Sequence, residues 1–176
     1  MNVDDLGFVD AMGLNIDWAR GYGRAAPGAR VVDTKPSTRG KHLSVLGALG
    51  ADTRRAALSV PGAVDGDASL VFTKQVRAPC VHPGKIVFMD KVPTHKMPPS
   101  AEAIAAVGAR VQFLPPYSPD LSPIENCCSK VKTFLRSLAA RTQKALDAAL
   151  STALATITHD DIKGWFAHCG YVEALN

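Results

Sequence analysis

Three acidic residues stand where carboxylates could do chemistry. Asp90 follows the apolar run KIVFM, Asp10 follows LGFV, and Glu125 opens a run with helical periodicity. A carboxylate at the end of a buried strand is costly unless a cation neutralises it. Mg²⁺ prefers oxygen ligands, so three acids brought together could hold two ions about 4 Å apart. Such a site could catalyse phosphoryl transfer by in-line displacement.

Glu125 also has a purely structural interpretation. In Ser122-Pro123-Ile124-Glu125, the serine suits the N-cap of a helix and the proline suits the first helical position. The glutamate stands three residues after the cap, where its carboxylate could accept from the backbone N–H of the serine. Taken alone, this capping box accounts for Glu125 without any catalytic role.

The N-terminal part of the sequence predicts strands separated by turns. Residues 6–13 (LGFVDAMG), 15–24 (NIDWARGYGR) and 42–50 (HLSVLGALG) carry apolar or alternating patterns typical of strands. Residues 69–76 (SLVFTKQV) suit either the start of a helix or a further strand.

The middle of the chain predicts a parallel pair of strands. The continuous apolar run in residues 85–90 (KIVFMD) is typical of a strand covered on both faces. Ser100 suits the N-cap of a helix that Gly108 would stop, and residues 111–116 (VQFLPP) predict another buried strand. Strand, helix and strand in this order indicate a right-handed crossover.

From Ser122 onward the periodicity becomes helical. A second helix is expected from Thr142, and a third from about Thr158 to a stop at Gly170. The first helix carries an apolar stripe of Ile124, Cys128, Val131, Leu135 and Leu138.

Composition indicates one globular domain. The chain has 176 residues, of which 47% are hydrophobic and 20% charged, and a net charge of +4 that favours a polyanionic partner. Its apolar runs are too short to span a membrane, and its acidic N-terminus does not resemble a secretory signal. The four cysteines have no zinc-binding spacing, so we expect free thiols and a reducing, intracellular environment.

Four blocks of the sequence resemble a known family. FVDAMG, GYGRAAPG, VFMDKVPTHK and FLPPYSPDLSPIENCCSKVKTFLR are similar to the catalytic domain of bacterial insertion-sequence transposases of the mariner superfamily, which are DDE transposases. The resemblance runs from about residue 8 to HCGY at residues 168–171. Its most specific part is the proline-rich block, in which 34 residues separate Glu125 from Asp90. The resemblance also implies a bacterial cytoplasm, close to the nucleoid. It implies an α/β fold: an RNase H-like mixed sheet with flanking helices and a helical C-terminal region.

The resemblance also implies a mechanism. Asp10, Asp90 and Glu125 would be the catalytic triad and the ligands of two Mg²⁺ ions, with Mn²⁺ as a substitute. The reaction would be cleavage of DNA at the ends of an element, followed by strand transfer into target DNA, commonly at TA. A homodimer, or association with a chain that supplies DNA recognition, is expected by the same analogy.

Basic residues in three regions are candidates for DNA contacts, and the region near the glycine-rich turn is the better candidate for phosphate contacts. A basic stripe on a helix is more often a solvated face, and a histidine in a loop could equally lie in solvent. One region follows the glycine-rich turn, one follows Asp90, and one shares a helical stripe with Glu125. The region near the glycine-rich turn contains Arg24, Arg30, Lys35, Arg39 and Lys41. The region after Asp90 contains His95 and Lys96, and the helical stripe contains Lys132 and Arg136.

The sequence departs from the family pattern at several positions. Lys91 replaces the usual asparagine after the second aspartate, Ala11 replaces a glutamate after the first, and Cys127 and Cys128 lie where a tryptophan is usual. Residues 1–9 are too few for the helix-turn-helix modules of a complete transposase. We therefore expect residues 1–176 to form a single catalytic domain without that N-terminal region.

Two hypotheses of different classes follow. The first is an active DDE nuclease and strand transferase whose DNA-recognition domain comes from elsewhere. The second is an inactive or truncated remnant that binds DNA or associates with a full-length transposase. A third is an RNase H-like nuclease of repair or RNA processing.

Overall fold

A computed structural model of the chain describes residues 2–34, 37, 42–52, 55–64, 68, 71–73, 81–90 and 98–171, without the side chains of residues 98–100. A five-stranded sheet in the order β3-β2-β1-β4-β5 forms its centre. After a short 3₁₀ turn at Val3–Asp5, the strands are β1 (Leu6–Leu14), β2 (Leu43–Gly50), β3 (Arg55–Pro61), β4 (Ile86–Met89) and β5 (Arg110–Phe113).

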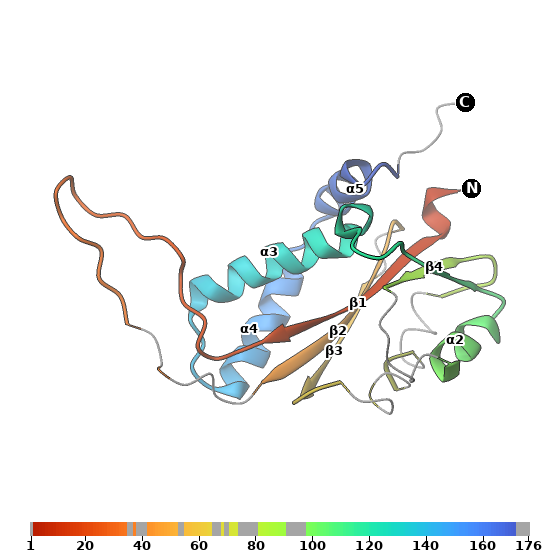
Figure 1. Ribbon diagram of the computed structural model, residues 1–176, viewed down its shortest axis with the longest axis horizontal. Coiled ribbons are helices and arrows are strands. Elements are labelled where there is room, and N and C mark those ends of the chain that lie inside the picture. The colour runs from red at the N-terminus through yellow and green to blue at the C-terminus, as the bar shows by residue number, and fades with distance from the viewer. Residues whose placement is uncertain are drawn as a thin grey trace.

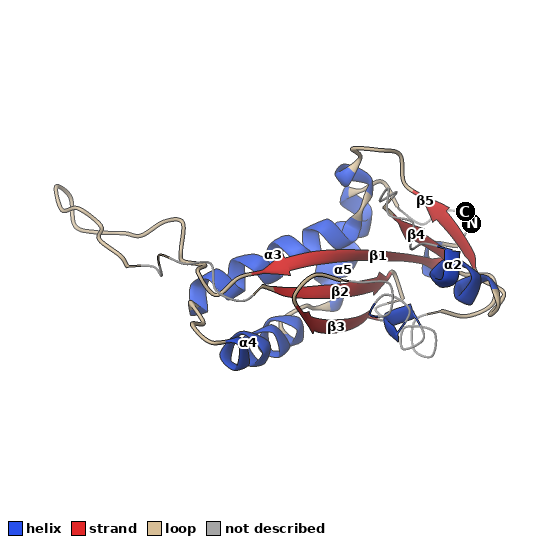
Figure 2. Ribbon diagram, turned by 60° about the horizontal axis from the view of Figure 1, so that its bottom comes forward, coloured by secondary structure: helices blue, strands red, loops and turns tan. Residues whose placement is uncertain are grey.

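The sheet is mixed. The first three strands pair antiparallel, whereas β1, β4 and β5 pair parallel to one another. Helix α2 (Pro98–Ala105) lies between β4 and β5 in the chain and contacts β5, as the sequence predicts for a crossover connection. The two kinds of pairing meet at β1, which is the central strand (Figure 2).

Helices cover the two faces of the sheet unequally. One face carries α3 (Pro123–Leu138), α4 (Gln143–Ala155) and α5 (His159–His168), and the other carries α2 (Figures 1 and 2). Alternate residues of β1, among them Leu6, Phe8 and Met12, join the larger core under the three C-terminal helices. Val9 instead packs on the opposite face with the cluster beneath α2.

Four aromatic rings form the centre of the larger core. The Phe8 ring stacks on Phe88 at 4.9 Å between centroids, and it meets Phe166 edge-on at 5.5 Å and Tyr171 at 5.2 Å. Phe8 and Phe88 are register partners in the β1–β4 pair. The cluster therefore ties the two central parallel strands to α5 and to the residues that follow it.

Side-chain caps mark the starts of the last two helices, as predicted. Thr142 accepts a hydrogen bond from the Ala145 N–H at 3.1 Å. Thr158 and Asp161 form a complete capping box at the start of α5, and Lys130 of α3 forms an ion pair with Asp161. This ion pair joins α5 to α3.

The predicted strand at residues 15–24 is wrong. These residues begin a connection that runs away from the sheet as an extended arm through residue 34, with almost all side chains from residue 20 onward exposed (Figure 1). The carbonyls of Ile16 and Trp18 accept hydrogen bonds from Arg141 at 3.0 and 2.7 Å. Alternation in the sequence did not lead to a strand because these carbonyls bond to a side chain instead of a neighbouring strand.

Several boundaries also differ from expectation. Strand β3 was not predicted, Ser100 lies inside α2 and not at its N-cap, and β5 is an exposed edge strand and not a buried one. Leu138, predicted to face inward, is 50% exposed because α3 ends there and projects past the sheet. The residues at 71–73 are helical, and the rest of that predicted segment lies outside the described residues.

Replacing Phe8 by alanine tests the aromatic cluster. We expect the Phe8→Ala change to lower the free energy of unfolding by about 3–5 kcal/mol, because it removes a buried ring and leaves a cavity. Urea denaturation would measure this. The control is Val32→Ala in the exposed arm, expected within about 0.5 kcal/mol of wild type; equal midpoints for the two variants would contradict the arrangement.

Candidate active site

The register of the central strands brings Asp10 and Asp90 together. The last parallel pair between β1 and β4 is Val9 with Met89, so each aspartate is the next residue on neighbouring strands. Asp10 shares its face of the sheet with Phe8 and Met12, which is the face beneath α3. One expectation needs correction: Asp10 does not end β1, which continues to Leu14 paired only with β2.

A proline-rich loop delivers the third acid. The Leu114 N–H donates to the Met89 carbonyl at 3.0 Å, which ties the start of the loop to the end of β4. After a 3₁₀ turn, η2 (Pro119–Leu121), the Tyr171 hydroxyl donates to the Leu121 carbonyl at 2.9 Å. Helix α3 then begins at Pro123, which is the predicted boundary.

The first turn of α3 packs closely on the strand beside Asp10. Gly47 of β2 is the register partner of Asp10, and a Cβ atom at Gly47 would lie 3.5 Å from Cδ1 of Ile124. A small residue at position 47 therefore lets the helix start approach the sheet. Glu125, the next residue after Ile124, is exposed and directed to the same region as the aspartates.

The predicted capping box at this helix is wrong. Ser122 is the N-cap, as predicted, and Pro123 occupies the first turn, but the serine side chain makes no capping hydrogen bond. The Ser122 N–H donates to the Pro119 carbonyl at 3.0 Å, because the preceding 3₁₀ turn continues directly into the helix. The Glu125 carboxylate is therefore not needed to cap this helix.

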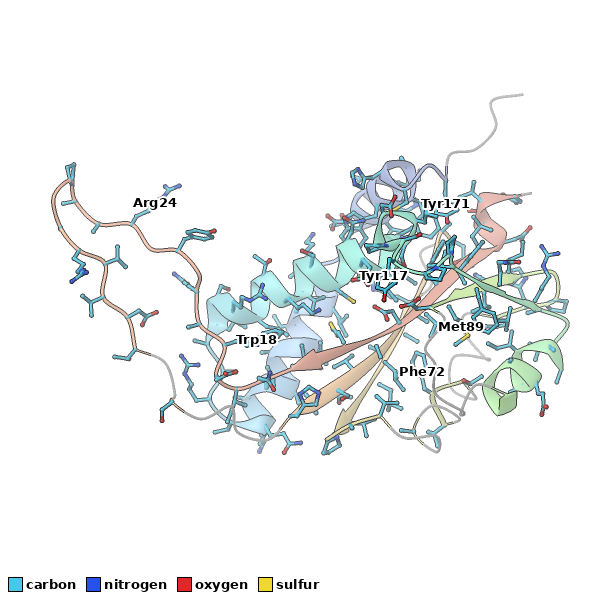
Figure 3. The ribbon with its side chains drawn as sticks, viewed as in Figure 1. Trp18, Arg24, Phe72, Met89, Tyr117 and Tyr171 are labelled. Carbon is cyan, nitrogen blue, oxygen red and sulfur yellow. The ribbon has the colours of Figure 1, made fainter. Side chains whose placement is uncertain are left out.

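All three acids line one cleft. Its volume is about 390 Å³, and its walls come from the middle of β1, the residue that follows β4, the proline-rich loop and the first turn of α3. The side chain of Tyr117 stands on the loop wall (Figure 3). The residues that line the cleft are Val9, Asp10, Asp90, Leu114, Pro115, Pro116, Tyr117, Ser118, Pro119, Ser122 and Glu125.

Burial and negative neighbours act together on Asp10. The pKa of the Asp10 carboxyl is raised from 3.8 to about 6. Burial is the largest cause, and the negative charges of Glu125 and Asp90 contribute to the same rise. The Ala11 backbone N–H and the Lys132 ammonium oppose the rise in pKa. Ionised carboxylates at this cleft therefore repel one another, which favours a bound cation.

The donor set suits a hard divalent cation. The charged groups among the described residues of the cleft wall are three carboxylates, and oxygen is the ligand atom that Mg²⁺ and Mn²⁺ prefer. Within the described residues, no group of three or more His, Cys, Asp or Glu side chains is tight enough to form a ready-made metal site.

The predicted DNA-contacting residues fall in different places. Lys132 is half-buried on α3, close enough to Asp10 to affect its pKa. Arg136 lies further along the helix, with its guanidinium 5.0 Å from the ring centre of Trp18. Arg24 and Arg30 are exposed on the arm, away from the cleft, and Figure 3 shows Arg24 there. Lys35, Arg39, Lys41, His95 and Lys96, together with Lys91, lie outside the described residues.

The other singled-out residues have structural roles. Cys127 and Cys128 are buried free thiols on α3, and burial raises their pKa values to about 11 and 12, so both stay protonated. The expected core packing of this pair is confirmed. Ala11 is exposed, and strand alternation directs it away from the face that carries Asp10.

Two tyrosines were missed. Tyr171 fixes the turn before α3 through its hydroxyl, and Tyr117 is fully exposed at the cleft. Neither has a signal in a single sequence, because the Tyr171 contact joins residues that are distant along the chain. The left-handed backbone conformation of Tyr117, with a φ angle of 58°, appears only in the structure.

Within the described part of the chain, no helix has the length and apolar character needed to cross a membrane.

Comparison with solved structures identifies the fold. The Mos1 strand transfer complex matches with a TM-score of 0.71 at 14% identity, over 96% of this chain and 55% of that one. The Mos1 mariner paired-end complex with Mn matches with a TM-score of 0.71 at 15% identity, over 97% and 54%. The catalytic domain of Mos1 mariner transposase matches with a TM-score of 0.65 at 11% identity, over 95% and 78%. The fold is therefore RNase H-like, as the resemblance implied.

A family model gives the membership. The model described as DDE superfamily endonuclease matches residues 5–147, and the chain belongs to this family. The chain spans about half the length of the proteins in the Mos1 complexes. Comparison with curated protein sequences gives no significant match.

The pKa of Asp10 leads to a pH-dependent prediction. Because the folded-state pKa lies above 3.8, ionisation of Asp10 destabilises the metal-free fold as pH rises from 3.8 through about 6. We expect Asp10→Asn in EDTA to raise the free energy of unfolding on the order of 2 kcal/mol at pH 8, and by less than half of that at pH 4.5.

Urea denaturation at the two pH values would measure this effect. The matched control is Asp33→Asn on the exposed arm, for which the change should not depend on pH in this way. A stabilisation by Asp10→Asn that is equal at both pH values would contradict the burial of Asp10.

Proposed function

We propose that this chain is a transposase catalytic domain that cuts DNA and transfers strands with the help of divalent metal ions. The observation that carries the proposal is the convergence of Asp10, Asp90 and Glu125 on one cleft from two strands and a helix. Family membership supports the same reaction class. The Mos1 complexes of similar fold include one with Mn and one with Mg.

The three carboxylates would be the ligands of the metal. Two bound Mg²⁺ or Mn²⁺ ions would activate the attacking water or 3′-hydroxyl and stabilise the leaving oxygen. Asp10 and Asp90 stand on neighbouring strands of the rigid sheet, so they would define the position of the ions. Glu125 on α3 would close the ligand set from the opposite wall.

The shape of the site also restricts the substrate. The cleft is open, and its ionisable side chains are acidic, so a phosphate group would approach only with cations present. Lys132 lies beside Asp10 and would help to hold the DNA backbone next to the ions. We propose Arg136 only as a weaker DNA contact, because its guanidinium already makes a cation–π contact with the Trp18 ring.

The inactive remnant is not favoured. Loss of the repulsive carboxylate at position 10 would stabilise the metal-free fold, so the presence of all three acids in one cleft supports a role in cation binding. Joining of two ends would also require a second catalytic unit or a chain that supplies DNA recognition. We propose such an assembly, inside the bacterial cell where the nucleoid provides the DNA.

A plasmid assay tests the proposal. In Mn²⁺, the purified chain should nick supercoiled DNA, and Asp90→Asn and Glu125→Gln should each lower the rate more than about 100-fold, beyond the usual effect of losing an outer-shell partner. Glu102→Gln, an exposed charge on α2, is the matched control and should nick at the wild-type rate. Equal nicking by the wild type and Asp90→Asn would rule out the assignment.

Thermal unfolding with added Mn²⁺ provides a readout that does not require activity. At an ion concentration 100 times the Kd, the wild type should be stabilised by about 2.7 kcal/mol. Asp90→Asn should show little stabilisation, whereas Glu102→Gln should behave as the wild type.

The DNA products of the plasmid assay distinguish the two reaction classes. Products joined to a second DNA molecule would indicate strand transfer, whereas nicked products alone would indicate simple hydrolysis, as by a repair or RNA-processing nuclease.

A further inference from the structure

We infer that the Tyr117 ring is a stacking platform for an unpaired nucleobase at the end of the DNA strand that enters the acidic cleft. The inference rests on the proposed function, because it takes DNA as the ligand. It adds a residue that would select the form of that DNA, namely a frayed or single-stranded end next to the reacting phosphate.

The exposure of Tyr117 is the first observation. The residue is 101% exposed, so its ring has no packing partner among the described residues, yet it belongs to the wall of the cleft that holds the three acids. Tyr22 is similarly exposed, at 97%, but stands on the arm. An unburied aromatic ring contributes nothing to the core, whereas it offers a flat apolar surface to a ligand.

The backbone of Tyr117 is the second observation. Its φ angle is 58°, a left-handed conformation that is unfavourable for a residue with a Cβ atom. Among the described non-glycine residues only Ala139 shares it, and Ala139 has an ordinary reason because it is the C-cap of α3. Tyr117 ends no helix, and strained residues of this kind cluster at functional sites.

The loop holds this conformation from both sides. Pro115, Pro116 and Pro119 restrict the chain on either side of the tyrosine. The Ser118 hydroxyl donates to the Pro116 carbonyl at 3.4 Å, so this bond spans Tyr117. The backbone that carries the ring is thus restricted before any ligand arrives, which lowers the entropic cost of binding.

The charge of the cleft explains why a neutral contact is useful there. Carboxylates repel phosphate groups, so a strand end close to them needs binding energy that does not come from charge. Stacking of a base on an aromatic side chain supplies this energy for any of the four bases and requires an unpaired base face. Tyr117 therefore favours the end of a strand over the interior of a duplex.

Fluorescence of an end-labelled DNA tests the inference. The probe is a duplex with an unpaired 3′ end that carries 2-aminopurine, mixed with the chain in Mg²⁺. Wild type and Tyr117→Phe should quench the probe, and Tyr117→Gly should not. Loss of the ring should weaken binding of the probe about 5- to 150-fold, the range expected for one stacked base, without a change in the salt dependence.

Two comparisons keep the result interpretable. Glycine suits a φ of 58°, so Tyr117→Gly should unfold at a temperature no lower than the wild type. The control variant Tyr22→Gly, on the arm, should quench the probe as the wild type does. With a fully paired duplex, the wild type and Tyr117→Gly should bind equally. Equal quenching and affinity for Tyr117→Gly and wild type would overturn the inference alone, provided that both nick plasmid DNA; failure of the wild type to bind or nick DNA would instead remove the proposed function.

Discussion

The position of the site depends on the packing of Phe8 against Phe88. Each ring lies two residues before a cleft aspartate, on the same face of the sheet, and the rings face one another across the β1–β4 pair. A slip of one residue in this register would move one aspartate to the opposite face. Tyr171 packs against both rings, and its hydroxyl donates to the turn before α3. A single aromatic cluster therefore connects the two strands that position the aspartates to the turn before the helix that carries Glu125.

Repulsion among the three carboxylates of the cleft opposes the packing that brings them together. The core beneath α3 partly buries Asp10, and two further carboxylates face the same cleft, so the ionised site destabilises the fold when no cation is present. A protein under selection for stability alone would replace one of these acids. Their presence in one cleft is understandable if a divalent ion changes the sign of the interaction, since each carboxylate then becomes an attractive ligand.

The sequence predicted what local patterns control. The apolar run that forms β4, the caps at Thr142 and Thr158, and the start of α3 at Pro123 all depend on short stretches of chain, and the structure confirms them. The arm was mistaken for a strand because alternating apolar residues satisfy the strand pattern whether or not a neighbour is available for pairing. In the same way, β5 resembles a buried strand in sequence but occupies an edge, a position that only the order of the sheet decides. The site acids were recognisable by type and spacing, whereas the contacts that orient them join residues distant along the chain.

The difference at the start of α3 bears directly on Glu125. The sequence offered a capping box, in which the carboxylate would be held by the backbone of its own helix. In the structure the turn at Pro119–Leu121 takes over that role: it supplies the acceptor for the Ser122 N–H, and Pro123 has no N–H to satisfy. Because prolines and the Tyr171 hydroxyl already fix where the helix begins, the Glu125 carboxylate is not required for structure. The proline-rich loop thus separates two tasks that the sequence motif alone would assign to one residue, and it leaves the acid available to the cleft.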